Sequence, residues 1–445
     1  MKIADIIEKN ISGDWGNDAI SDDYPCEVYC VRGADIEPIK CQDYDHLPKR
    51  FIAQRSFNNK LLRPGDIVIE KSGGSPTQST GRVCLITYEM ISRKHDIVCS
   101  NFCAAFRVKS EWDPEYIYLY LQYIYNCGVF FNFEGKTSGL KNLQMDQAFN
   151  AIEIKPIPLD EQKRLAKCIS VLDSKMSINR AINQNLVAMA KQLYDYWFVQ
   201  FDFPNEEGKP YKSTGGAMQW CEKLKRDIPV GWEVKPLKEI CTVKDGTHDS
   251  PKPQTEGLPL ITSKHLLSSG LDFKNAYLIS KEDFDVINKR SKVEQYDILF
   301  SMIGTIGNKY FVNEKVINFA IKNMALIKTS EIEGLMYYIM YNLGAVDYVR
   351  YENNALSGSI QKFLSLDAMR NIPILYNEKL MSLYNEKVRH YQELYVINKE
   401  ENILLLKQKE ELLPLLMNGQ ASITPLNSDL HDRFVIEIIL LIDEK

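Results

Sequence analysis

The sequence predicts an α+β fold in which two similar domains are separated by two long antiparallel coiled-coil helices and related by a pseudo-two-fold axis. The first observation is a seam from Leu165 to Trp197 with alternating steps of four and three, which is the spacing of a coiled coil. The second observation is a similar seam 219 residues later, from Tyr384 to Leu416. Two similar halves in one chain favour the intramolecular form of a symmetric dimer.

The repeat extends upstream of the two seams. Asp66 to Val68 matches Asp297 to Leu299 at an offset of 231, and Phe106 to Lys109 matches Ala325 to Lys328 at an offset of 219. The difference predicts an insertion of 12 residues in the first copy, between about positions 69 and 101. A common scaffold with variable loops is how proteins usually vary what they bind. The alternative, chance similarity of hydrophobic patterns, is disfavoured by the shared asparagines and by Ser-Gly pairs at 138–139 and 357–358.

The predicted elements follow this repeat in chain order. The first domain should alternate short strands with turns, with a helix near 114–126 and a last strand at 152–154. The apolar run 434–442 is compatible with a strand, a docked helix or a frayed end. The predicted segments are a first domain at 1–158, a first long helix at 159–201, a linker at 202–230, a second domain at 231–375, a second long helix at 376–418 and a tail of unknown role at 419–445.

Asparagines in the two seams predict how the long helices pair. Asparagine in a coiled-coil core is unfavourable unless it meets a partner, and its best-attested role is to fix register. If the two-fold axis passes between the members of each pair, Asn179 should face Asn402 and Asn183 should face Asn398. The expected helix-pairing residues are Leu165, Leu172, Asn179, Asn183, Leu186, Leu193, Tyr391, Asn398, Asn402, Leu405 and Leu412.

Composition narrows the class of protein. Apolar content of 45% and charged content of 25% are ordinary for a globular protein, and no run of eighteen apolar residues predicts a membrane span. Ten cysteines without a small-domain framework, together with no signal-peptide layout, lead us to expect a reducing cytoplasmic location. The net charge of −5 argues against general coating of nucleic acid but allows local basic patches.

Catalytic and metal-binding motifs are missing from the sequence. The chain has no Pro-Pro-aromatic motif and no glycine-rich cofactor loop of a DNA methyltransferase, and it has no phosphate-binding loop with its Gly-Lys-Ser/Thr end. The pairs Cys26/Cys30 and Cys99/Cys103 fall in strand-like runs, so buried structural thiols are favoured over a zinc site. We therefore expect no catalytic residues, no metal site and no cofactor on this chain.

A polar stretch in the inserted region is the best candidate for contacts with DNA. Residues 70–82 hold donors, acceptors, glycines and flanking cations, and such side chains read base edges or contact phosphate. The alternative is a flexible polar loop without a binding role. Turn-rich polar residues of the second copy are further candidates. The expected DNA-binding residues are Lys71, Ser72, Gly73, Gly74, Thr77, Gln78, Arg82, Lys141, Lys244, His248, Lys264, His265 and Lys309.

Several segments resemble the specificity subunits of type I restriction-modification systems. Pro158 to Gln162, followed by the first seam and Trp197-Phe198, resembles the central helix of that family. The run from Pro229 to Val234 resembles the entry to one of its target-recognition domains. Gly65 to Val68, and Asp297 to Ser301 with the Gly304–Gly307 loop, resemble its strand-loop motif. The resemblance covers about residues 1–418.

This resemblance implies a non-catalytic DNA reader. The two target-recognition domains would read the two halves of a bipartite, asymmetric site on double-stranded DNA. The paired helices would dock two methyltransferase subunits, and restriction subunits that translocate and cut DNA could join them. S-adenosylmethionine, ATP and Mg would belong to those partner subunits. The alternatives are a coiled-coil scaffold or interaction protein without DNA sequence specificity, and an enzyme with an unrecognised site.

Overall fold

The computed structural model describes residues 1–73, 78–137, 140–267, 270–332, 334–358, 362–425 and 434–438. The chain folds into two compact units: unit 1 comprises Met1–Arg180 and Glu400–Lys445, and unit 2 comprises Ala181–Lys399. Unit 1 is therefore built from both ends of the chain. In the part of the chain that the structure describes, no helix is long and apolar enough to cross a membrane.

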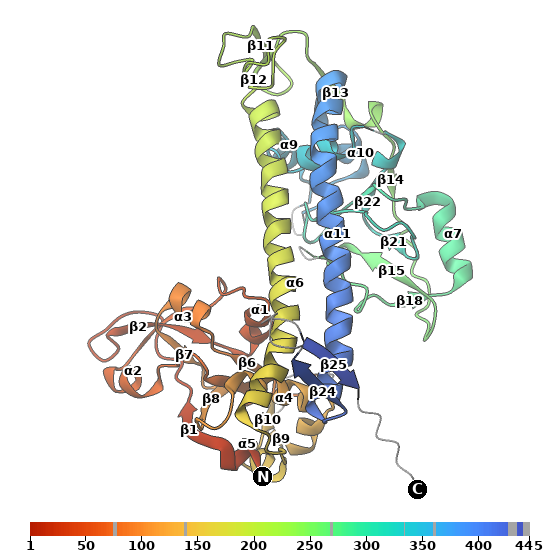
Figure 1. Ribbon diagram of the computed structural model, residues 1–445. Helices are drawn as coiled ribbons and strands as arrows, with labels where there is room; N and C mark the ends of the chain where they lie inside the picture. The colour runs from red at the N-terminus through yellow and green to blue at the C-terminus, as the bar shows by residue number, and fades with distance from the viewer. Residues whose placement is uncertain are drawn as a thin grey trace. The chain divides into compact units, whose positions relative to one another are not determined.

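Unit 1 contains a four-stranded sheet in the order β1-β8-β4-β6 and two three-stranded sheets in the orders β3-β2-β7 and β5-β10-β9 (Figure 1). Of these neighbours, β2 and β7 run parallel, whereas the other pairs are antiparallel. The strands are β1 (Ile7–Ser12), β2 (Cys26–Val31), β3 (Lys49–Ile52), β4 (Ile67–Glu70), β5 (Ser72–Gly73), β6 (Val83–Leu85), β7 (Ile97–Cys99), β8 (Cys103–Val108), β9 (Glu134–Thr137) and β10 (Leu140–Leu143). The helices of the first domain are α1 (Ile36–Lys40), α2 (Gln54–Lys60), α3 (Tyr88–Lys94), α4 (Pro114–Asn126) and α5 (Met145–Ala151).

The core of unit 1 forms around α4. Pro114 occupies its first turn and the Asp113 side chain accepts from the Tyr116 amide, which is a typical N-terminal cap. Its buried face packs in one cluster with the main sheet, and Leu413 and Leu416 from the last turn of the second long helix belong to the same cluster. The end of the second helix thus completes the core that contains the first domain.

Unit 2 repeats this plan. Its four-stranded sheet has the order β14-β22-β19-β20 and its three-stranded sheet the order β18-β15-β21, in which β15 and β21 run parallel. The strands are β11 (Met218–Cys221), β12 (Arg226–Pro229), β13 (Glu233–Pro236), β14 (Val243–Asp245), β15 (Leu258–Thr262), β16 (Leu266–Leu267), β17 (Gly270–Leu271), β18 (Leu278–Ile279), β19 (Ile298–Phe300), β20 (Lys309–Phe311), β21 (Ala320–Lys322), β22 (Ala325–Ile327) and β23 (Pro373–Tyr376). The short helices are α7 (Lys281–Ser291), α8 (Met336–Asn342), α9 (Val346–Ala355) and α10 (Leu366–Arg370).

An equivalent buried ion pair marks the repeat in both units. Asp66, at the start of β4, pairs with Arg107 at 2.8 Å, and Asp297, at the start of β19, pairs with Lys328 at 2.6 Å. The first members are 231 residues apart, whereas the second members are 221 apart rather than the predicted 219. The alignment of this strand by sequence was wrong by two residues, because a shift of two keeps every side chain on the same face.

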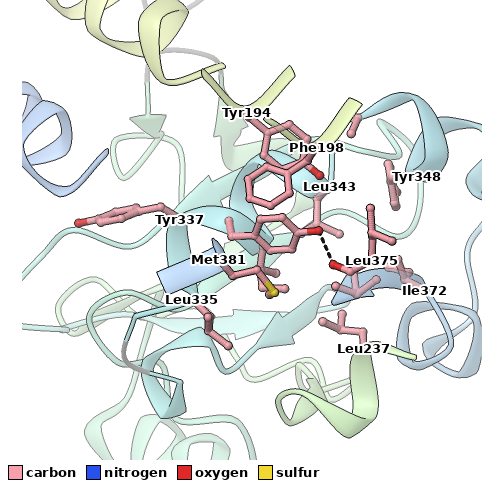
Figure 2. Close-up of a cluster of buried hydrophobic side chains, with 14 of the residues drawn as sticks. Tyr194, Phe198, Leu237, Leu335, Tyr337, Leu343, Tyr348, Ile372, Leu375 and Met381 are labelled. Atoms are coloured by element: carbon pink, nitrogen blue, oxygen red, sulfur yellow. Dashed lines mark hydrogen bonds between the residues drawn. The ribbon is translucent and has the colours of Figure 1, made fainter. Parts of the chain in front are cut away.

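The end of the first long helix fills the core of unit 2. Tyr194 and Phe198 are buried, and their ring centroids lie 5.2 Å apart. Figure 2 shows both side chains pointing into the cluster that contains Leu343 and Leu375. The dashed line in Figure 2 marks the hydrogen bond that the buried Tyr338 hydroxyl donates to the Leu375 carbonyl oxygen, at 2.6 Å.

The two long helices are α6 (Leu159–Tyr194), which continues into a π-helical turn at Asp195–Val199, and α11 (Glu378–Met417). They run antiparallel and lie side by side (Figure 1). In unit 1 the Asn179 amide donates to the Asn402 side-chain oxygen at 3.0 Å, and in unit 2 the Asn398 amide donates to the Asn183 oxygen at 2.9 Å. These are the contacts that the predicted register requires. The predicted fold class, two similar domains with two long antiparallel helices, is confirmed.

Two smaller expectations differ from the structure, and the structure decides between the alternatives for a third segment. The stretch 202–230 is folded rather than a simple linker: it contains the β11–β12 hairpin, and the Phe203 ring stacks on Tyr211 at 4.7 Å. The predicted last strand of the first domain is only an isolated bridge between Lys2 and Glu153. In the tail, β24 (Ala421–Pro425) pairs antiparallel with β25 (Phe434–Ile438), so the described part of the 434–442 run is a strand, one of the three alternatives, and residues 439–442 lie outside the described residues.

Candidate nucleic-acid interface

In unit 1 the polar stretch after β4 lies against the β9–β10 hairpin. Ser72 and Gly73 pair with Asn142 and Lys141 across the β5–β10 ladder. The Ser72 hydroxyl also donates to the Asn142 side chain. Lys141 Nζ lies 3.2 Å from the carbonyl oxygen of Gln78, whose side chain is exposed. Ser72, Gly73 and Gln78, which were predicted to contact DNA, therefore lie beside Lys141, a predicted residue more than sixty positions later in the sequence.

Lys71 and Ser72 face different hollows, as neighbouring residues of an extended segment do. Lys71 lines a cavity of about 510 Å³ with Ser12, Gln144 and Gln147, and its ammonium group has no hydrogen-bond or ion-pair partner among the described residues. Ser72 lines a second cavity of about 510 Å³, described below. The Lys71 ammonium group therefore has hydrogen-bond donors that are free to bind a ligand from solvent. Gly74 and Thr77, also predicted to contact DNA, lie outside the described residues.

Arg82 has a structural role that its sequence position does not reveal. Its guanidinium donates two hydrogen bonds to the Glu70 carboxylate, at 2.9 and 2.7 Å, and both side chains are almost fully buried. The hydrogen bonds to Glu70 raise the pKa of Arg82. Because the pair satisfies both charges inside the domain, the expectation that Arg82 is available to DNA is corrected.

In unit 2 three turns bring predicted and unpredicted polar residues together. The His248 ring is exposed. Its Nδ1 lies 2.9 Å from Asn323 Oδ1, and its Nε2 lies 2.8 Å from Asp245 Oδ2. The hydrogen bond with Asn323 and the charge of Asp245 raise the pKa of His248. The Ser263 hydroxyl donates to the Asn323 carbonyl oxygen at 3.2 Å, which places the exposed Lys264 on the next residue of the same turn. Lys244 is half-buried on β14, a strand that ends at Asp245, three residues before His248.

Two other predicted residues of unit 2 point inward. His265 is 1% exposed, and its Nδ1 accepts from the Thr262 amide at 3.0 Å, so it caps a turn. Lys309 donates to the Met340 carbonyl oxygen at 2.9 Å, and burial lowers the pKa of its ammonium group to about 8. Both expectations of DNA contact are corrected, because these side chains are engaged within the fold.

The hairpin beside the strand-loop motif recurs in both units. The Leu143 amide donates to the Lys71 carbonyl oxygen at 2.7 Å, and the Leu364 amide donates to the Met302 carbonyl oxygen at 2.9 Å. In unit 2 this arrangement leaves the side chains of Ile303 and Phe363 about 40% and 38% exposed. The motif thus builds one scaffold that presents different side chains in the two units.

Sequence reasoning missed residues that the fold brings to these surfaces. In unit 1 the turn between β7 and β8 presents Asn101 and Phe102, and Trp15 and Arg32 lie beside it. In unit 2 the missed residues are Asn323 and Lys322, whose ammonium group contacts Ser250. Asn323 has a φ of 54°, and an asparagine at a left-handed turn is a weak signal in sequence. The others carry no local signal, since only tertiary contacts bring them together.

Four of the predicted helix-pairing residues, Asn179, Asn183, Asn398 and Asn402, form hydrogen bonds between α6 and α11. In unit 1, Lys409 Nζ also donates to both carboxylate oxygens of Asp173 at 2.7 Å. In unit 2, the Tyr384 hydroxyl donates to the Ala190 carbonyl oxygen at 2.9 Å. The buried or half-buried seam residues are Leu165, Leu172, Asn179, Asn402, Leu405 and Leu412 in unit 1 and Asn183, Leu186, Leu193, Tyr391 and Asn398 in unit 2.

Large apolar side chains also lie on the outer faces of these helices. Soluble proteins seldom expose several such residues in one stretch unless a partner covers them. In unit 1 the exposed residues are Val171, Ile178, Ile403, Leu404 and Leu406, and in unit 2 they are Ile182, Val187, Met189, Tyr196, Leu383, Leu394 and Ile397.

Three of the four cysteines in the two predicted pairs are buried, whereas Cys26 is half-buried. Cys30, Cys84, Cys99 and Cys103 are all buried in unit 1, and burial raises the pKa of Cys30 to about 12. The described residues include no group of three or more His, Cys, Asp or Glu side chains that could hold a metal ion.

Comparison with known proteins adds a family to this geometry. A family model described as "Type I restriction modification DNA specificity domain" matches residues 52–188 and 229–376, one match in each copy of the repeat. The type I restriction enzyme MjaIX specificity subunit from Methanocaldococcus jannaschii is 24% identical over 284 residues, which cover 60% of this chain and 60% of that protein. This alignment therefore spans less than two thirds of the relative. The MjaVIII specificity subunit from the same organism is 24% identical over 315 residues, which cover 67% of this chain and 68% of that protein.

A solved structure is similar over nearly the whole chain. The type I restriction-modification system S subunit from M. genitalium has a TM-score of 0.52 and 16% sequence identity, and the match covers 96% of each chain. At this identity the likeness shows the fold alone.

Proposed function

Because the chain belongs to the type I restriction-modification DNA specificity family, we propose that it is the sequence-specific DNA recognition subunit of a type I restriction-modification complex. Each unit reads one half of a bipartite, asymmetric site on double-stranded DNA. The observation that carries this proposal is that the same strand-loop scaffold occurs twice and presents different side chains each time. Two unequal readers in one chain suit two unequal half-sites.

The contacts with DNA come from polar residues that are exposed or half-buried on the surface of each unit. In unit 1 these are Lys71, Ser72, Gln78 and Lys141, and in unit 2 they are Lys244, His248 and Lys264. Lysines position the protein on phosphates, whereas Ser, Gln and His side chains read base edges. Arg82, His265 and Lys309 are not part of this proposal, since their polar groups are engaged within the fold.

The exposed apolar residues on α6 and α11 are the proposed docking surface for two methyltransferase subunits, to which restriction subunits add. S-adenosylmethionine, ATP and Mg act on those partners, and this chain contributes no catalytic step. Val171, Ile178 and Ile403 are 55%, 55% and 68% exposed, so covering each would contribute part of the roughly 1.5–3 kcal/mol that full burial of such a side chain gives.

Reconstitution tests the proposal. The chain, its candidate methyltransferase partner and both together are incubated with genomic DNA and labelled S-adenosylmethionine, and methylated adenines are mapped. Methylation of one bipartite sequence only in the presence of both proteins is the expected result. Methylation by the partner alone at the same sites would leave the chain without a role in recognition. Methylation by the chain alone would instead support the alternative of an enzyme.

The second candidate function is a coiled-coil scaffold without DNA sequence specificity, which the long paired helices alone would suit. The scaffold and the reader predict different results in this reconstitution. A scaffold would raise methylation at all sites of the partner, whereas a reader restricts methylation to one sequence.

A further inference from the structure

A cavity in unit 1 lies beside the proposed DNA-reading residues and has no assigned role. Its volume is about 510 Å³. The described residues that line it come from four separate parts of the first domain: Trp15; Arg32, Gly33 and Ala34; Glu70, Ser72 and Gly73; and Ser100, Asn101 and Phe102. Ser72 belongs both to this cavity and to the polar stretch that lies against the β9–β10 hairpin. The cavity is therefore part of the surface that would face DNA.

Aromatic side chains form two of its walls. The Arg50 guanidinium covers the Trp15 ring at 4.1 Å and donates to the Trp15 carbonyl oxygen at 2.9 Å, which holds the ring in place. The Phe102 side chain is 56% exposed, yet its carbonyl oxygen accepts from the amides of Lys71 and Ser72 at 2.8 and 3.0 Å. The Phe102 ring is therefore an apolar surface that packing within unit 1 leaves in contact with water, and such surfaces often bind a ligand.

Polar groups at the cavity have free hydrogen-bonding capacity. The Ser100 hydroxyl is buried, and its neighbour for hydrogen bonding among the described residues is the Cys103 thiol, which is a weak partner. The exposed Asn101 side-chain amide, at the rim, has no partner among the described residues. A buried polar group without a strong partner is destabilising unless a ligand or water satisfies it.

The charges that line the cavity are already balanced. Glu70 is paired with Arg82 at 2.7 Å, and Arg32 is paired with Asp35 at 2.8 Å. An ideal Cβ on Gly33 or Gly73 would lie only 2.5 or 2.9 Å from Glu70 Oε1, so both positions are glycine where the backbone approaches this carboxylate. A phosphate would gain no unpaired cation here. The suitable ligand is uncharged, planar and polar at its edge.

We propose that this cavity receives a single nucleobase of the first half-site, turned out of the double helix. This inference rests on the proposed function, since DNA must lie on this face of unit 1. In intact duplex DNA, the groups that protrude toward a concave site are phosphates and thymine methyl groups. The paired charges at the cavity disfavour a phosphate. The cavity volume of about 510 Å³ is far larger than a methyl group. An extruded base stacks on the rings of Trp15 and Phe102 and presents its edge to Ser100 and Asn101.

The proposal predicts an unusual response to mismatched DNA. Extrusion costs unstacking and unpairing energy, and this cost is smallest for a base that is already unpaired. The full complex of this chain with its methyltransferase partner is titrated with duplexes of the mapped site. At each position of the first half-site except the adenine that the partner methylates, which the methyltransferase itself turns out of the helix, the base opposite is replaced to give a mismatch, and Kd is measured by fluorescence anisotropy.

A mismatch at one position of the first half-site should tighten binding by on the order of tenfold or more. Phe102→Ala should abolish this gain, because the base loses a stacking partner. The matched control is Tyr88→Ala, which removes an 84% exposed aromatic ring of the same unit that does not line the cavity and should keep the gain. Asn101→Ala should reduce discrimination at the same position only.

Two results would overturn the inference while the proposed function stands. In the first, the complex binds its site specifically but every mismatch in the first half-site weakens binding or leaves it unchanged. In the second, replacing a thymine by uracil weakens binding at one position without any mismatch gain, which means that the cavity takes a methyl group of intact duplex. If the wild-type complex shows no sequence preference at all, both the inference and the proposed function fail.

Discussion

Burial divides the charged residues of each unit into those that stabilise the fold and those that are free to bind. Arg82, Arg107 and Lys328 all lie in ion pairs with buried carboxylates. Lys71 and Lys264 have no such partner among the described residues. The sequence could not separate the two groups, because a lysine or arginine in a polar stretch looks the same whether its partner lies twelve residues away, as Glu70 does for Arg82, or is absent.

Removing Arg82 tests its structural role. Arg82→Ala leaves the Glu70 carboxylate buried without a partner, so unit 1 should lose about 3–5 kcal/mol of unfolding free energy. The measurement is chemical denaturation. The control is Lys49→Ala, which removes an exposed partner of Glu27 and should leave the midpoint unchanged. Native stability in Arg82→Ala, together with weaker DNA binding, would restore Arg82 as a DNA contact.

The buried ammonium group of Lys309 should make the stability of the protein depend on pH. Burial lowers the pKa of its ammonium group to about 8, below its ordinary value of 10.5. Between these two values the unfolded chain binds more protons than the folded chain, so the contribution of Lys309 to stability rises as pH increases. The difference in unfolding free energy between the wild type and Lys309→Met should therefore change in favour of the wild type from pH 8 to pH 10.5. A difference that is constant with pH would contradict the buried site.

At the level of elements, the two long helices were the most predictable part. The seam spacing and the asparagine pairs determine which residues meet, because coiled-coil packing follows a fixed period. The short strands were harder to align, since alternation with a period of two hides a shift of two residues, as at Arg107 and Lys328. The folded stretch at 202–230 was missed because Phe203 packs against Tyr211 and Trp232 without a regular spacing in the sequence.

The asparagine pairs should act as coupled units. Asn402→Leu removes one of the two acceptors of the buried Asn179 amide in unit 1 and leaves its bond to Glu401 at 2.6 Å, so one N–H loses its partner at a cost of about 1–3 kcal/mol. The double variant Asn179→Leu/Asn402→Leu should cost less than the sum of the single variants, because neither polar group is then left unpaired. A double-mutant cycle by chemical denaturation measures this coupling. Additive effects would show that the two side chains do not interact.

At the scale of the whole molecule, unit 1 needs the end of the chain. Leu413, Leu416 and Met417 pack in its core. The equivalent positions in the first copy, 219 residues earlier, are Tyr194, Trp197 and Phe198. The cavity residues Trp15 and Phe102 likewise meet only through the completed fold, so no local pattern could have predicted that site.

A chain that ends just after Phe198 tests this organisation. It keeps one reader and one seam helix, and it should dimerise to bury that seam, so that with the methyltransferase partner it methylates an inverted repeat of the first half-site. The position equivalent to Lys409 is Ala190, so this dimer lacks the ion pair with Asp173, and Ala190→Lys should restore it and lower the dimer Kd. Sedimentation measures the association. A fragment that folds but stays monomeric at micromolar concentration would contradict the seam, and a dimer that methylates the original asymmetric site would contradict the division between the readers.

The central claim is that each unit reads one half of the site. It is tested most directly by mapping methylated adenines across a genome with complexes that carry the wild-type chain, a unit 1 variant (Ser72→Ala with Gln78→Ala) or a unit 2 variant (His248→Ala with Lys264→Ala). The account predicts that the unit 1 variant relaxes positions in one half of the methylated motif and that the unit 2 variant relaxes positions in the other half only. Variants that both alter the same half, or that leave the whole motif unchanged, would contradict it.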